Sequence, residues 1–137
     1  MGVEIYTDGC ALGNPGASGA GIVMVFGEHQ KELIIPLGHG TNNTAELLAV
    51  IHALEALNRP CEVNVYSDSQ WVVKCGSREW QRKANMDLWK RYNDASERHI
   101  VRLHWIRKDS HTLNKRAHIL ANKAANNSAM DLLGDAS

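Results

Sequence analysis

The sequence YTDGCALGNPG at residues 6–16 completes an alternation of apolar and polar residues that begins near the N-terminus. Alternation with a period of two is typical of a β-strand that buries one face, and Asp8-Gly9 predicts the end of that strand. The triplet Asn14-Pro15-Gly16 is a turn signal. The stretch therefore predicts a strand over residues 2–8 that turns back into a second strand.

The segments that follow predict two more strands, over residues 20–27 and 31–37, and then a change of period. Beyond Asn43 the apolar residues recur at helical spacing, and Asn43 with Glu46 fits a capping box. This pattern predicts a helix over residues 44–57.

The remainder of the chain alternates between strand and helix patterns. We predict a strand over 62–67, a short helix over 69–75, a helix over 86–97, a strand over 100–106 and a final helix over 113–126. Early hairpins imply antiparallel pairing, whereas helices between later strands imply parallel pairing. We therefore expect an α/β fold: a five-stranded mixed sheet, three antiparallel strands then two parallel, with helices on both faces. One domain is expected over residues 1–126, and a flexible tail over 127–137.

Composition limits the class of protein. The 137 residues suffice for one domain with a core, and no apolar run approaches the ~18 residues that a membrane span needs. Cys10, Cys61 and Cys75 are an odd number without metal-ligand spacing, and the N-terminal stretch lacks a secretory pattern. We expect a reduced, cytoplasmic setting, no membrane association, no obligate protein partner and a monomer.

The net charge of zero conceals an uneven distribution. Residues 71–123 hold 13 of the 15 Lys and Arg and 5 acids, giving 13 − 5 = +8. Residues 1–70 hold 2 bases and 8 acids, giving 2 − 8 = −6. Scattered solvated charges would explain this, but so would an acidic cation site beside a basic phosphate-binding surface.

Three acids lie where the predicted elements would meet. Asp8 ends the first strand, Glu46 lies in the first turn of the first helix, and Asp68 follows the fourth strand. Clustered carboxylates repel one another unless a cation lies between them, and their oxygens suit Mg²⁺. Singly, each has an ordinary explanation as a turn residue, a capping partner or an N-cap. Jointly, those explanations require three coincidences.

Three motifs carry a resemblance to a known family. YTDGCALGNPG, TNNTAELLAV (41–50) and YSDSQWVV (66–73) match, in order and spacing, the core motifs of type 1 ribonuclease H over nearly the whole chain. The resemblance implies a ribonuclease H-like fold and an endonuclease that hydrolyses the RNA strand of RNA–DNA hybrids. It implies two divalent ions, Mg²⁺ or Mn²⁺, on Asp8, Glu46 and Asp68, and products with 5′-phosphate and 3′-hydroxyl ends.

The resemblance also implies which residues contact the hybrid. Polar groups without strict base preference can read the 2′-OH groups that distinguish RNA from DNA. Thr41 with Asn14 resembles the family's pocket for a DNA phosphate. The complete set of expected substrate-binding residues is Gly9, Asn14, Thr41, Asn42, Asn43, Gln70, Trp80 and Asn114.

The final motif departs from the family pattern. In HTLNKRAHILA (111–121) Asn114 matches, but His118 takes the place of the family's fourth catalytic aspartate. A polar stripe of Asn114, His118 and Asn122 favours a solvated histidine, whereas the resemblance favours a position at or near the metal site. Because imidazole suits Mn²⁺ better than Mg²⁺, we hypothesise an active enzyme in which Mn²⁺ gains on Mg²⁺.

Two other segments depart from the family. The loop before the final helix is one residue shorter than usual and keeps His111, the nearest candidate for the family's mobile loop histidine. GSREWQRKANMDLW (76–89) is too short for the family's basic protrusion. Stacking and charge from neighbouring residues would then supply a reduced, salt-sensitive DNA-contacting surface. The residues expected to form it are Trp71, Arg78, Trp80, Arg82 and Lys83, whereas Trp89 and Trp105 are expected in the core.

Two alternative functions remain open from the sequence. The first is a hybrid-binding module that has lost catalysis with its fourth acid. The second is another nuclease on this fold, such as a Holliday-junction or transposition domain. The three intact acids argue against the first, because a binding module has little reason to keep like charges together. The GNPG turn, the Asn42-Asn43 pair and Gln70 argue against the second.

Overall fold

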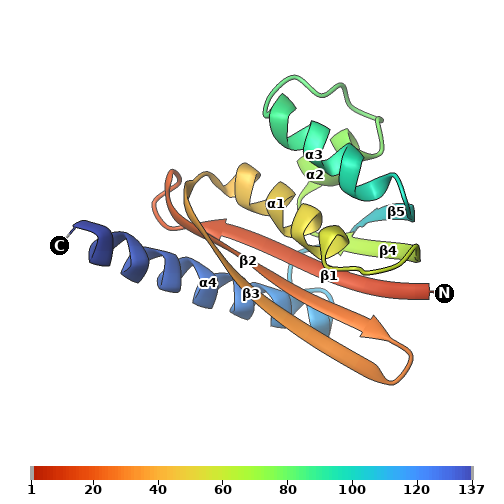
Figure 1. Ribbon diagram of the computed structural model, residues 1–137, viewed down its shortest axis with the longest axis horizontal. Coiled ribbons are helices and arrows are strands. Elements are labelled where there is room, and N and C mark those ends of the chain that lie inside the picture. The colour runs from red at the N-terminus through yellow and green to blue at the C-terminus, as the bar shows by residue number, and fades with distance from the viewer. Residues whose placement is uncertain (1, 137) are drawn as a thin grey trace.

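The computed structural model describes residues 2–136, which form a single five-stranded sheet with helices on both faces (Figure 1). In chain order the elements are β1 (Gly2–Ala11), β2 (Gly16–Phe26), β3 (His29–Gly40), α1 (Asn42–Glu55), β4 (Glu62–Ser67), α2 (Gln70–Gly76), α3 (Met86–Ser96), β5 (Ile100–Trp105) and α4 (Thr112–Ala136). None of the helices within this described range is long and apolar enough to cross a membrane.

The sheet has the strand order β3-β2-β1-β4-β5. The first three strands pair antiparallel, while β1 with β4 and β4 with β5 pair parallel. This arrangement confirms the expected mixed sheet. It also places β1 at the centre, so that its end lies between β2 and the end of β4.

The two faces of the sheet carry different helices. α1 lies on one face together with α2 and α3, and α4 crosses the other face (Figure 1). Alternate residues of β2 serve the two cores: Ile22 and Met24 pack on the α1 side, while Val23 packs beneath α4. The alternation of β2 therefore holds a helix layer against each face.

Two glycines in β2 allow the backbone of α4 to lie close to the sheet. A Cβ atom on Gly21 would lie 2.2 Å from the Ala117 carbonyl oxygen, and one on Gly19 would lie 2.2 Å from the Ala125 nitrogen. Only hydrogen atoms fit at these two positions. The backbone of α4 therefore lies directly on the strand, which fixes the height of α4 above the sheet.

Two local expectations are corrected. β1 does not end at Asp8, because its pairing with β2 continues to Ala11 opposite Ser18. The N-cap of α1 is Thr41, whose side chain accepts from the Thr44 N–H, and Thr44 Oγ1 accepts from the Thr41 N–H in return. Glu46 is therefore free of any capping role.

The last helix is longer than expected. α4 continues to Ala136, so the segment expected to be a flexible tail over 127–137 is helical as far as that residue; residue 137 lies outside the described range. Ser128 is buried and its Oγ accepts from the Gly38 N–H at 2.8 Å. This contact with β3 explains why the helix extends beyond residue 126.

The segment between α2 and α3 closes on Arg82, which was expected on the DNA-contacting surface. Arg82 is instead buried: its Nε donates to the Cys75 carbonyl oxygen at 2.9 Å, and its guanidinium lies 4.3 Å from the centre of the Trp89 ring. Trp89 is 1% exposed, which confirms its place in the core, whereas Trp105 is 45% exposed and was wrongly expected there.

Candidate metal centre

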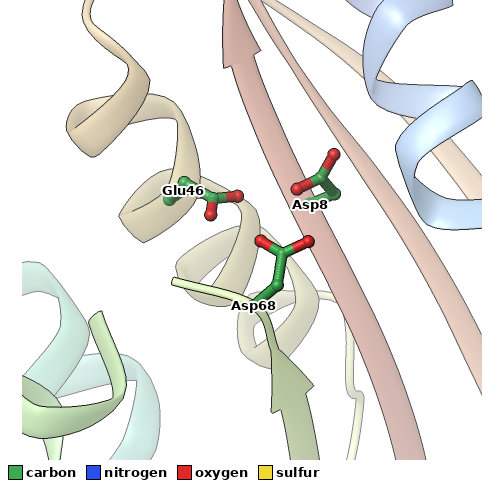
Figure 2. Close-up of side chains that lie close together, drawn as sticks. All are labelled: Asp8, Glu46 and Asp68. Atoms are coloured by element: carbon green, nitrogen blue, oxygen red, sulfur yellow. The ribbon is translucent and has the colours of Figure 1, made fainter. Parts of the chain in front are cut away.

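The three predicted acids converge at one point. Asp8 comes from β1, Glu46 from the first turns of α1, and Asp68 from the residue after β4; their carboxyl groups point toward one another (Figure 2). One oxygen of each lies within 4.8 Å of the others. Asp8 is 4% exposed and Glu46 is 8% exposed. The prediction that these three residues meet is confirmed.

Gly9 brings α1 against β1 at this point. A Cβ atom on Gly9 would lie 2.3 Å from the Ala45 carbonyl carbon, so no side chain fits there. The Gly9 N–H donates to Glu46 Oε1 at 2.5 Å. Gly9 is buried and its amide N–H positions Glu46, whereas its contact with a hybrid stays a prediction.

The electrostatics of the cluster are unfavourable without a cation. Burial raises the pKa of Asp8, and the charge of Asp68 adds to this, while hydrogen bonds from His118 and Glu46 oppose it. Burial, followed by the charges of Asp8 and Asp68, holds the pKa of Glu46 well above its usual range. Buried oxygen ligands that resist ionisation until a positive charge is present suit a hard divalent cation.

A pH dependence follows for the metal-free protein. Because the folded-state pKa values of Asp8 and Glu46 exceed their ordinary values of 3.8 and 4.5, the native state binds more protons than the unfolded state. The free energy of unfolding should therefore fall as pH rises through the raised values. Denaturant titrations in EDTA would measure this fall, and saturating Mg²⁺ or Mn²⁺ should reduce it by binding the ionised carboxylates.

Glu46→Gln provides the matched control for that dependence. The variant removes one raised carboxyl group but keeps every other titrating side chain. It should show a shallower fall in stability with rising pH than the wild type. Identical pH profiles for the two proteins in EDTA would contradict the electrostatic account of the cluster.

Asp68 is held by two contacts that periodicity alone did not predict. The Trp105 indole N–H donates to the Asp68 carbonyl oxygen at 3.1 Å, which accounts for the exposed position of Trp105. Asn114 Nδ2 donates to Asp68 Oδ2 at 3.4 Å, and its Oδ1 accepts from the Asp109 N–H at 2.7 Å. Asn114 is 0% exposed and supports Asp68, whereas its contact with a hybrid stays a prediction.

His118 lies beside the centre, on the turn of α4 that faces β1. Its Nδ1 is 2.8 Å from Asp8 Oδ2, and its Nε2 is 3.2 Å from the Asn122 side-chain nitrogen. With Asn122 donating to Nε2, the Nδ1 proton faces Asp8. The imidazole is thus hydrogen-bonded to one Asp8 oxygen and lies next to the three acids.

His111 packs against the sheet. Its ring stacks on Tyr6 with centroids 4.7 Å apart, and its Nδ1 accepts from the Leu113 N–H at 3.0 Å. Tyr6 in turn stacks on Tyr66, and Tyr66 on His104, so that the rings of His111, Tyr6, Tyr66 and His104 form a row along the sheet. A catalytic role for His111 from this loop stays a prediction.

Two of the other residues expected to bind the hybrid contact each other. Asn42 connects α1 to the turn after β1, because its Oδ1 accepts from the Ala11 N–H at 2.8 Å and its own N–H donates to Asn14 Oδ1 at 2.9 Å. Thr41 adjoins this pair as the N-cap of α1. The residues of the expected set that are exposed are Asn14, Asn42, Asn43, Gln70 and Trp80. Their contact with a hybrid stays a prediction.

Part of the basic half of the chain is neutralised internally. Arg91 pairs with Glu55 and Arg116 pairs with Glu32, each at 2.6 Å. The excess of +8 counted from the sequence therefore overstates the charge that is free to meet phosphates.

The comparisons with known proteins agree with this architecture. The family profile described as RNase H matches residues 1–126. The chain belongs to the RNase H family. Ribonuclease H of Pseudoalteromonas atlantica is 41% identical over 143 aligned residues, which cover 93% of each chain. Ribonuclease HI of Caulobacter vibrioides is 45% identical, and the alignment covers 88% of this RNase H and 91% of that protein.

Solved structures resemble this RNase H over nearly its whole length. The N-terminal RNase H domain of a Mycobacterium tuberculosis protein superposes with a TM-score of 0.85 at 28% identity, covering 96% of this chain and 99% of that chain. LC11-RNase H1, solved in complex with an RNA/DNA hybrid, gives a TM-score of 0.75 at 27% identity, covering 92% and 98%.

Proposed function

We propose that this RNase H is an endoribonuclease that hydrolyses the RNA strand of RNA–DNA hybrids, with divalent metal ions held by Asp8, Glu46 and Asp68. The observation that carries the proposal is the buried cluster in which one oxygen of each acid lies within 4.8 Å of the others. In support of the proposal, burial and the neighbouring carboxylates raise the pKa of Asp8 and Glu46, as suits a cluster that binds a cation.

The chemistry proposed is phosphodiester hydrolysis to 5′-phosphate and 3′-hydroxyl ends. Two Mg²⁺ or Mn²⁺ ions, when bound, would activate the attacking water and stabilise the leaving oxygen. The protein's own residues fix the ligands: Gly9 orients Glu46 through its amide, and Asn114 orients Asp68. His118 orients Asp8 or contributes to the coordination directly.

Hybrid recognition is assigned to the exposed side chains around the centre. The amides of Asn14, Asn42, Asn43 and Gln70 can bond sugar hydroxyl groups and minor-groove edges without selecting a sequence. Thr41, beside Asn14, is assigned to a DNA phosphate. The exposed indole of Trp80 offers a stacking surface on the α2–α3 segment.

One assay separates this function from the alternatives. Labelled RNA–DNA hybrid, duplex RNA and duplex DNA are each incubated with the protein and either Mg²⁺ or Mn²⁺. We expect cleavage of the hybrid's RNA strand alone. Binding of the hybrid without cleavage in either metal would identify a hybrid-binding module, and cleavage of duplex DNA would identify another type of nuclease on this fold.

The His118→Asp variant tests the choice of metal. An aspartate at this position adds a hard oxygen ligand, so Mg²⁺-supported cleavage should rise relative to Mn²⁺-supported cleavage. Because outer contacts of a metal site change affinity by about 10- to 100-fold, we expect a shift of that order in the ratio of the two rates. Equal ratios in wild type and variant would contradict a role for His118 at the metals.

We further propose that the protein acts in the cytoplasm as a monomer. The proposed location rests on its cysteines: among the described residues Cys10, Cys61 and Cys75 all remain free thiols, as suits a reducing compartment. Sedimentation of the purified protein would test the monomer, and a dimer at micromolar concentration would contradict it.

A further inference from the structure

Lys108 lies at the tip of a tight turn between β5 and α4. The Ser110 N–H donates to the Arg107 carbonyl oxygen at 3.1 Å, and Asp109 adopts a left-handed φ of 59°. The Lys108 side chain is exposed. The turn therefore presents a cation to solvent at the point where the chain enters α4.

The turn has a fixed place beside the metal centre. Immediately before it, the Trp105 indole N–H bonds to the Asp68 carbonyl oxygen. Within it, the Asp109 N–H bonds to Asn114 Oδ1, and the other end of the same amide reaches Asp68 Oδ2. Because both connections lead to Asp68, the turn lies at the edge of the acidic cluster.

The histidine of this loop is engaged within the protein: its ring packs against Tyr6 on one face, and its Nδ1 accepts from the Leu113 N–H. Lys108, by contrast, makes none of the side-chain hydrogen bonds or ion pairs found among the described residues. Arg107, at the start of the turn, is exposed as well, so variants of both residues are compared below.

We propose that the Lys108 ammonium binds a backbone phosphate of the RNA strand at the metal centre, an inference that rests on the proposed function. Three clustered carboxylates repel a polyanionic hybrid, and a cation beside them offsets this repulsion for the phosphate that must come closest. A flexible, strongly hydrated ammonium suits this role as a point charge.

Hybrid binding as a function of salt tests the proposal. Dissociation constants are measured in EDTA, where the hybrid stays intact, across about a tenfold range of NaCl concentration. Loss of one phosphate contact in Lys108→Ala should lower the slope of log Kd against log salt by about 0.9 and weaken low-salt binding by roughly five- to tenfold. Lys108→Arg, which keeps the charge, should retain the wild-type slope.

Lys123→Ala is the matched control. Lys123 is an exposed lysine of α4 whose charge acts on Glu32 of β3, away from the turn. The Lys123→Ala variant should show the same slope of log Kd against log salt as the wild type. Three results would each overturn the proposal: an unchanged slope of log Kd against log salt in Lys108→Ala, an equal reduction of that slope in Lys123→Ala, or a reduction in Arg107→Ala alone. Failure of the wild type to cut hybrid would instead count against the proposed function, because the slopes are measured without cleavage.

Discussion

Replacing Asp8 with asparagine is expected to lower hybrid cleavage by about 1000-fold while raising the thermal stability of the metal-free protein. A bound metal supplies several kcal/mol of transition-state stabilisation, and each 1.36 kcal/mol corresponds to a factor of ten in rate. An asparagine keeps the shape of Asp8 but loses the charge that holds the metal. The same change removes a buried carboxylate, and it relieves the repulsion from Asp8 that, after burial, raises the pKa of Glu46.

The opposite signs of these two effects make the experiment informative. Single-turnover cleavage in Mg²⁺ and thermal unfolding in EDTA are measured for Asp8→Asn and for Asp94→Asn, an exposed aspartate of α3. The control should match the wild type in both. An Asp8→Asn protein that is inactive but also less stable would indicate misfolding rather than the loss of a metal ligand.

Gly21→Ala is expected to produce a large loss of stability from a single added carbon. The new Cβ would lie 2.2 Å from the Ala117 carbonyl oxygen and 2.4 Å from the Ala121 nitrogen, and neither backbone atom can rotate away. α4 must therefore shift, at a cost of about 3 kcal/mol or more. Since α4 carries Asn114 and His118, cleavage should fall as well.

Gly2→Ala is the matched control for that substitution. It adds the same atom to β1, where nothing lies within 4 Å of the new carbon. Its free energy of unfolding should stay within about 0.5 kcal/mol of the wild type. Equal stabilities for the two variants would contradict the view that contact between the α4 and β2 backbones sets the position of the helix.

Most of the sheet could be predicted from the sequence because its signals are local. The continuous apolar run around Ile22 and Val23 fits a strand that is buried on both faces, and the turn signals predict antiparallel pairs. The convergence of Asp8, Glu46 and Asp68 also follows from the order of the elements, since each acid lies near the end of an element at one edge of the layout.

The corrections concern side chains whose role depends on distant partners. The sequence suggests that Arg82 is a surface cation, but in the structure its guanidinium group contacts the Trp89 ring and the Cys75 carbonyl oxygen. The sequence suggests that Trp105 is a core residue, but in the structure its indole N–H donates to the Asp68 carbonyl oxygen. Periodicity predicts on which face of a helix or strand a residue lies, but it does not predict which residues of other elements contact that face.

The extent of α4 illustrates the same point. The polar composition of residues 126–137 predicts a frayed end, and no capping signal marks a later one. The helix nevertheless continues, because Ser128 finds the amide of Gly38 on β3. That contact joins positions far apart in the sequence, so local propensity could not reveal it.

The central position of β1 also has a consequence for synthesis. β1 can pair with β2 as soon as the first hairpin leaves the ribosome, but its other edge must wait for β4. Asp8 is synthesised early, in β1. Its neighbour Asp68 follows β4, and His118 lies in α4, the last element of the chain. The nascent chain therefore cannot assemble its metal centre until translation has passed α4, which separates the making of the ligands from the onset of nuclease activity.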